Sequence, residues 1–258
     1  MSELDRFRLD GRVALVAGGS GGIGIRLCAA FAGVGAKVGV IGRRAEEARA
    51  AADGAGGDAL VLTGDMTSEA DADRVVDEAM TRWGRVDILV NAIGGGAGTA
   101  LYPAESYPES EWDRIVDLNL RSQFLASKAA ARAMIAGGRG GRILNISSVR
   151  GQLGIDNGFS AYVAAKGAMN ALTRQHATEW AKHAITVNAI SPTFVRTPQV
   201  EDLLSDEAFV EGLLMRIPLR RIAETDDLVG AVLFFCSDAS SFCTGQVLTL
   251  DGGLTATQ

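Results

Sequence analysis

The sequence has little cysteine, proline or positive charge. The cysteines Cys28, Cys236 and Cys243 are far apart and form no C-x-x-C pair, so the chain predicts neither a disulfide framework nor a zinc or other metal site. We expect all three to be reduced and buried. Lysine and arginine number 25 against 31 aspartate and glutamate residues, which gives a formal net charge of −6 without any basic block. This charge pattern disfavours nucleic acid or an anionic membrane as a partner.

Long hydrophobic runs are also missing. The most apolar stretch, Ala231 to Cys236, is much shorter than the roughly 18 residues that a membrane span needs. Residues Met1 to Asp10 carry alternating charges rather than a basic segment followed by an apolar one, so no secretory signal is indicated. We therefore expect a cytoplasmic protein.

What the chain does contain is an alternation of short β-branched runs with longer helical patterns, which is typical of parallel strands joined by crossover helices. With 258 residues and 47% hydrophobic residues, it predicts one α/β domain over 1–258, a seven-stranded parallel sheet with helices on both faces. The expected strands are Arg12–Ala17, Lys37–Ile41, Ala59–Thr63, Val86–Asn91, Gly141–Ser147, Ile185–Ser191 and Gln246–Leu250. The expected helices are Gly22–Val34, Arg44–Asp53, Glu69–Trp83, Glu109–Ala136, Ala161–His183 and Asp226–Cys236. The proline-bracketed segment 192–218 is expected to contact a ligand.

A glycine-rich loop separates the first expected strand from the first expected helix. Its residues are Gly18-Gly19-Ser20-Gly21-Gly22-Ile23-Gly24. Glycine allows a tight turn and lets a pyrophosphate approach peptide N–H groups at a helix N-terminus, where the helix dipole favours an anion. The alternative is a flexible turn without a ligand. Its spacing, G-x-x-x-G-x-G, differs from the dinucleotide pattern G-x-G-x-x-G.

Two arginines follow the second expected strand. A fold that accepts NAD usually has an acidic residue there for the ribose 2′-OH, whereas arginine accommodates a 2′-phosphate. This chain has Arg43 and Arg44 and no carboxylate at the strand tip, which favours NADP(H), with NAD(H) as the alternative. The pair could otherwise be a solvated helix start.

A third motif carries acid–base chemistry. Tyr162 and Lys166 are four residues apart in an expected helix, so their side chains share one face. A nearby ammonium lowers the pKa of a phenol and makes it a useful proton carrier. Ser148, just past a buried strand, can donate a hydrogen bond to a substrate oxygen. Asn119 interrupts a helical pattern and is either functional or a helix-kink residue.

Taken in order along the chain, these motifs resemble those of the short-chain dehydrogenase/reductase family, whose fold is a three-layer, doubly wound Rossmann fold. The resemblance covers essentially the whole length and includes the glycine loop, Asn119, Ser148, Tyr162 and Lys166. It implies that Tyr162 is the acid/base, that Ser148 polarises the substrate oxygen, that Lys166 lowers the Tyr162 pKa and holds the nicotinamide ribose, and that Asn119 positions a relay water.

The same resemblance implies a cofactor site. Asp65 would meet the adenine, Asn91 the adenosine ribose region, and Val195 and Thr197 the carboxamide of the nicotinamide. The full expected set is Gly18, Ser20, Gly21, Gly22, Ile23, Gly24, Arg43, Arg44, Asp65, Met66, Asn91, Ala92, Ile93, Tyr162, Lys166, Pro192, Thr193, Val195 and Thr197. The implied reaction is hydride transfer between the nicotinamide and a carbonyl or secondary alcohol.

For the substrate, the chain looks most like the branch of the family that contains gluconate 5-dehydrogenases and other sugar-acid or polyol dehydrogenases. The 3-oxoacyl thioester reductases are the alternative. Arg150 and Arg196 flank the expected site and either hold a substrate carboxylate or are surface charges.

Two other classes share this fold. A non-catalytic dinucleotide-binding sensor or scaffold would be expected to lose the tyrosine or lysine, and both remain here. Sugar-nucleotide epimerases keep the pair but add a substrate lobe, for which 258 residues leave little room. By resemblance we expect a homotetramer with Asp226 to Gln258 near a subunit contact.

Overall fold

The computed structural model describes residues 3–96, 100–156 and 158–256. Its centre is a parallel sheet in the order β3-β2-β1-β4-β5-β6-β7. The strands are β1 (Val13–Ala17), β2 (Lys37–Gly42), β3 (Ala59–Thr63), β4 (Ile88–Asn91), β5 (Gly141–Ile146), β6 (Ile185–Pro192) and β7 (Val247–Leu250). This confirms the expected seven-stranded, doubly wound fold. Each strand lies within two residues of its expected bounds.

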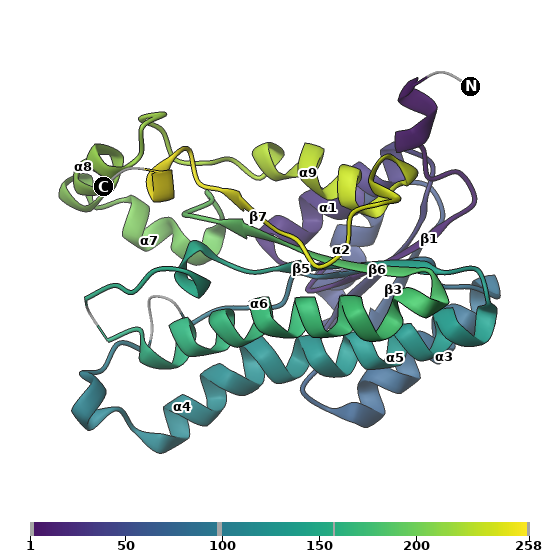
Figure 1. The fold of residues 1–258 in the computed structure, drawn as a ribbon, viewed down its shortest axis with the longest axis horizontal. Coiled ribbons are helices and arrows are strands. Elements are labelled where there is room, and N and C mark those ends of the chain that lie inside the picture. The colour runs from purple at the N-terminus through teal and green to yellow at the C-terminus, as the bar shows by residue number, and fades with distance from the viewer. Residues whose placement is uncertain (1–2, 97–99, 157, 257–258) are drawn as a thin grey trace.

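Helices cover both faces of the sheet, as Figure 1 shows. One face carries α1 (Gly22–Gly33), α2 (Ala45–Ala55) and α9 (Asp226–Cys236), and the other carries α3 (Glu69–Trp83), α5 (Ser122–Gly137) and α6 (Ser160–Trp180). Each face has its own apolar core. Because both faces are covered, strands such as β1 are buried at every position, which explains why they read as continuous apolar runs.

The expected long helix at 109–136 is divided by a π-helical turn. α4 (Glu109–Val116) leads into the π-helix Asp117–Arg121, which is followed by α5. Asn119 lies in this turn and is fully buried. The interruption expected at Asn119 is therefore confirmed, and π-turns of this kind occur often at functional sites.

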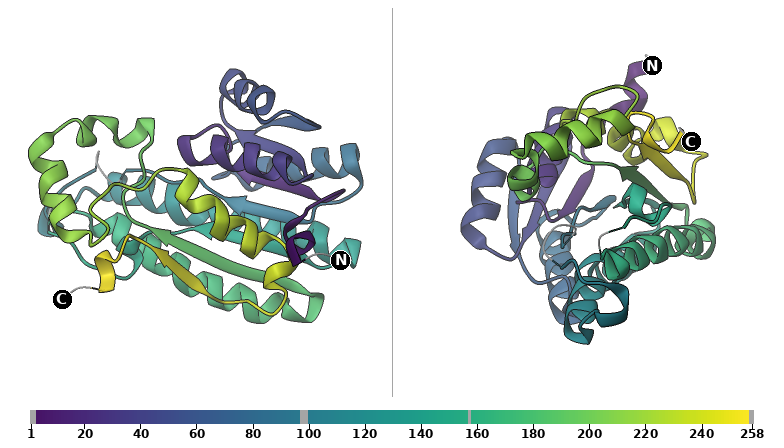
Figure 2. Two further views of the ribbon diagram at one scale, coloured as in Figure 1. Left: turned by 90° about the horizontal axis from the view of Figure 1, so that it is seen from above. Right: turned by 90° about the vertical axis from the view of Figure 1, so that its left-hand side faces the viewer.

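The chain between β6 and α9 forms a separate helical layer. It contains α7 (Glu201–Leu204) and α8 (Glu207–Arg216), which pack through a small apolar cluster of their own. Figure 2 shows these helices at one end of the sheet, away from the N-terminus. Since this segment leaves the carboxyl end of β6, it covers the edge of the sheet where α/β folds bind ligands.

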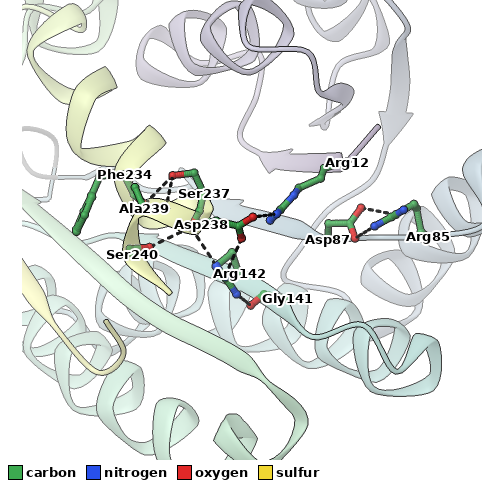
Figure 3. Close-up of polar contacts among 10 residues, drawn as sticks. All are labelled: Arg12, Arg85, Asp87, Gly141, Arg142, Phe234, Ser237, Asp238, Ala239 and Ser240. Carbon is green, nitrogen blue, oxygen red and sulfur yellow. Dashed lines mark hydrogen bonds and ion pairs between the residues drawn. The ribbon is translucent and has the colours of Figure 1, made fainter. Parts of the chain in front are cut away.

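The amino ends of the strands, at the opposite edge, are closed by charge pairs (Figure 3). The carboxylate of Asp238 accepts hydrogen bonds from Arg12 and Arg142. Asp87, the residue before β4, accepts from Arg85 and from the backbone N–H of Val13. Asp238 and Asp87 therefore have charged partners within the protein.

No helix among the described residues is long and apolar enough to cross a bilayer.

Candidate active site

The glycine loop joins β1 to α1 at the point where the strand order reverses. Gly18 has φ +83°, and a Cβ there would lie 2.8 Å from the carbonyl oxygen of Ala92. Only glycine fits this close crossing of two backbones. α1 begins at Gly22, and its cap residue Gly21 provides no side-chain hydrogen bond. The first N–H groups of α1 therefore have no capping side chain and are suited to an anion.

A cavity of about 450 Å³ lies over this loop. It includes the six expected loop residues, both arginines after β2, and Asp65, Met66, Ala92, Ile93 and Thr197. Asp65 is fixed at its edge by accepting hydrogen bonds from the N–H and hydroxyl of Thr67, at 2.9 and 2.8 Å. The uncapped helix start at one point and cationic side chains at another match the chemistry of a dinucleotide with several phosphates.

The two arginines differ in their surroundings. Arg44 forms an ion pair with Glu47 at 2.7 Å, whereas Arg43 has no ion pair within the described ranges. Both are exposed and line the cavity. Arg43 is therefore the more available guanidinium for a phosphate.

A second cavity of about 300 Å³ continues from the first and shares Ile23, Thr197, Gln199 and the loop after β4 with it. Ser148, Tyr162 and Lys166 all line this second cavity. They come from two elements, since Ser148 follows β5 and the other two lie one turn apart on α6. The structure thus brings together three of the four residues that the sequence indicated as catalytic. Pro192, Thr193 and Val195 line the same cavity.

Burial and polar neighbours set the protonation behaviour of Tyr162. Burial raises the pKa of Tyr162, opposed by a hydrogen bond with Ser148 and by the positive charge of Arg150. Burial also lowers the pKa of Lys166 to about 7. Lys166 Nζ lies 5.7 Å from the centre of the Tyr162 ring and donates to the carbonyl oxygen of Ile146 at 3.0 Å.

Lys166 is not among the groups that shift the Tyr162 pKa in this structure, so its expected effect on that pKa stays a prediction. Burial also disfavours the charged form of Lys166, and its amine donates a hydrogen bond to the backbone carbonyl oxygen of Ile146. The groups that favour the Tyr162 anion are Ser148 and Arg150 instead. Arg150 was not expected in this role.

Asn119 and Asn91 lie outside both cavity linings. The Asn119 side chain accepts from the N–H of Gly95 at 3.1 Å and donates to the carbonyl oxygens of Gly95 and Ile115. It therefore holds the loop after β4 against the π-helix. Asn91 donates to Ser127 and to Asn145, each at 2.8 Å, and its own carbonyl oxygen is buried without a partner.

The segment after β6 contributes cavity-lining residues that no sequence motif indicated. Gln199 lines both cavities, and Asp202 and Leu203 line the second. Only the bracketing prolines indicated that this region contacts a ligand. Arg196, by contrast, is held by Glu224 at 3.2 Å and is half-exposed. Neither Arg196 nor Arg150 lines these two cavities, but the positive charge of Arg150 acts on Tyr162.

Together these groups can move a proton at an oxygen atom. A carbonyl oxygen placed between the hydroxyls of Ser148 and Tyr162 would receive a hydrogen bond from one and a proton from the other. A bound nicotinamide would supply the hydride. The glycine loop and the β6 segment would hold and orient that group.

Comparison with known proteins agrees with this geometry. The family model described as "Enoyl-(Acyl carrier protein) reductase" matches residues 17–255. The gluconate 5-dehydrogenase of Gluconobacter oxydans is 39% identical over 258 residues, covering 99% of each chain.

Two solved structures are similar over the whole fold. A gluconate 5-dehydrogenase from Burkholderia cenocepacia, solved with NADP and tartrate, has a TM-score of 0.93 and 36% identity, covering 100% of both chains. A short-chain type dehydrogenase/reductase from Mycobacterium marinum has a TM-score of 0.92 and 37% identity, covering 99% of this chain and 100% of the other. The chain therefore belongs to the short-chain dehydrogenase/reductase family of oxidoreductases.

Proposed function

We propose that the protein transfers a hydride between NADP(H) and a carbonyl or secondary alcohol of a sugar acid or polyol. The observation that carries this proposal is the joint placement of Ser148, Tyr162 and Lys166 in a cavity continuous with the glycine-loop cavity. In reduction, a new C–H bond forms at the carbonyl carbon from the hydride, and Tyr162 donates its proton to the oxygen. Oxidation is the reverse.

In this proposal Lys166 and Tyr162 contact the nicotinamide ribose, and the glycine loop binds the pyrophosphate. Asn119 acts through the loop after β4, which it holds in place, and Asn91 supports the end of β4 beneath the cofactor.

We further propose one domain over 1–258, with 192–218 as the substrate-binding segment. A cytoplasmic homotetramer is proposed by resemblance, with Asp226 to Gln258 near a subunit contact; residues 257–258 lie outside the described part of the chain.

A cofactor-linked absorbance screen at 340 nm tests the function. The substrates are sugar acids, polyols, 3-oxoacyl thioesters and hydroxysteroids, each with NADP(H) and NAD(H). We expect turnover with a sugar acid or polyol and NADP(H). Turnover restricted to thioesters would instead support the 3-oxoacyl reductase alternative. Dinucleotide binding without any turnover would support a sensor.

Cofactor preference tests the arginines after β2. Replacing both Arg43 and Arg44 by glutamine should lower kcat/KM for NADPH, relative to NADH, by roughly 10- to 100-fold, because charge-assisted hydrogen bonds to the 2′-phosphate are lost. Arg49→Gln is the matched control, since Arg49 lies on α2, the helix that directly follows the two arginines, and does not line the cavity. A preference that is the same in the double variant and in the control contradicts the assignment.

A further inference from the structure

A third cavity, of about 750 Å³, adjoins the one that contains Tyr162. The two cavities share Phe194 and Leu203. Helix α8 forms part of the wall of this third cavity through its residues Phe209 and Leu213. A substrate whose carbonyl lies between Ser148 and Tyr162 can therefore extend past Phe194 into this space.

Most of the cavity wall is apolar, but two guanidinium groups, Arg150 and Arg216, also line it. Asp156 is the acidic residue in the lining. Arg150 belongs to the short helix directly after Ser148 and is only 7% exposed. Arg216, at the end of α8, is exposed. The two arginines come from segments far apart in the chain and meet at one cavity.

Arg150 has no counter-ion among the residues that the structure describes. Within the described ranges, its one side-chain hydrogen bond runs to the carbonyl oxygen of Gly154 at a long 3.4 Å. The charge of Arg216 acts on it unfavourably, and burial together with this repulsion lowers the Arg150 pKa. A buried, unpaired charge is costly, and an anionic ligand group relieves that cost.

We propose that Arg150, assisted by Arg216, binds a carboxylate of the substrate, so that the enzyme acts on hydroxy or oxo acids in preference to neutral polyols. The forked guanidinium of Arg150 matches the two oxygens of a carboxylate. Binding there fixes the acid at one end while the reacting carbon lies beside Tyr162. The proposal rests on the proposed function, because it concerns the substrate of the same site.

The test measures affinity rather than turnover. Calorimetric titrations of the enzyme, with and without saturating NADP⁺, compare D-gluconate with D-glucitol, D-galactonate with galactitol, and 3-hydroxybutyrate with 1,3-butanediol. Each pair differs in the carboxylate alone. We expect at least one acid to bind about 10-fold or more tightly than its alcohol, which is the size of a charge-assisted contact.

Variants assign the effect to the arginines. Arg150→Gln should weaken binding of that acid by roughly 10- to 100-fold, and Arg150→Lys, which keeps the charge but loses the fork, should weaken it less. Arg216→Gln should have a smaller effect than Arg150→Gln because Arg216 is exposed. Arg49→Gln, distant on α2, should have none. Thermal melting confirms that each variant is folded.

Three results overturn the proposal: no acid binds more tightly than its alcohol, Arg150→Gln and Arg150→Lys both leave acid affinity unchanged, or Arg196→Gln alone lowers it. Titration of NADP⁺ reports on the proposed function separately. If NADP⁺ does not bind but an acid still binds through Arg150, the proposed function fails and the carboxylate site stands.

Discussion

Replacing Tyr162 by phenylalanine is expected to lower kcat by roughly 10²- to 10⁴-fold, the usual contribution of a positioned proton donor. The substitution removes one hydroxyl and leaves the ring, which packs against the buried cluster of Ala100, Ile115 and Ala161, so the fold should be unaffected. NADPH affinity should be nearly unchanged, because the phosphate loop and the arginines after β2 are intact. Initial rates at saturating substrate and NADPH fluorescence titrations measure the two quantities.

Tyr102→Phe is the matched control. Tyr102 belongs to the same apolar cluster, and its phenol lines neither the glycine-loop cavity nor the cavity with Ser148. The control should retain wild-type kcat. If both phenylalanine variants have the same activity, Tyr162 is not the proton donor.

Replacing Gly24 by alanine should give the second large effect. A Cβ at Gly24 would lie 2.1 Å from the carbonyl oxygen of Gly18 and 2.7 Å from the Cα of Gly19. Both atoms belong to backbone, so the loop itself must move. Overpacking of this kind costs about 1–3 kcal/mol, which corresponds to roughly 5- to 150-fold weaker NADPH binding if the displaced loop no longer presents its N–H groups.

The control for Gly24→Ala lies on the same helix. Gly33 is the last residue of α1, and a Cβ there meets no atom within 4 Å. Gly33→Ala should bind NADPH normally and melt at the same or a slightly higher temperature, since alanine favours the helix. Equal NADPH affinity in the two alanine variants would show that the Gly18–Gly24 contact does not shape the cofactor site.

The sequence predicted the sheet well because its inner strands are buried on both faces. β1, for example, has no exposed position, so its apolar run is distinct from the amphipathic helices around it. The site residues near such strands were also predictable. Ser148 follows β5 directly, and Lys166 is one turn from Tyr162 on α6, so short-range geometry alone places them at one edge of the sheet.

Contacts between distant segments could not be predicted in this way. Arg150 and Arg196 are equivalent as sequence features, yet Arg196 pairs with Glu224 while Arg150 has no acidic partner among the described residues. Which arginine is free depends on how the segment after β6 folds back. The same holds for Lys166, whose pKa depends on its burial rather than on its distance along the helix from Tyr162.

The glutamine at 199 illustrates the same limit. It lines both the cofactor and the catalytic cavities, but nothing in the neighbouring sequence distinguishes it from a surface residue. Only the turn of the chain after β6 brings it over the loop that follows β4.

The central claim is that Tyr162 and Lys166 lie beside the pyridine ring of a bound dinucleotide. A crystal structure of the protein with NADP⁺ tests it most directly. The nicotinamide ring is expected to lie in the 300 Å³ cavity with Ser148 and Tyr162, with its ribose in contact with Lys166. A ring bound elsewhere, away from these side chains, would contradict it.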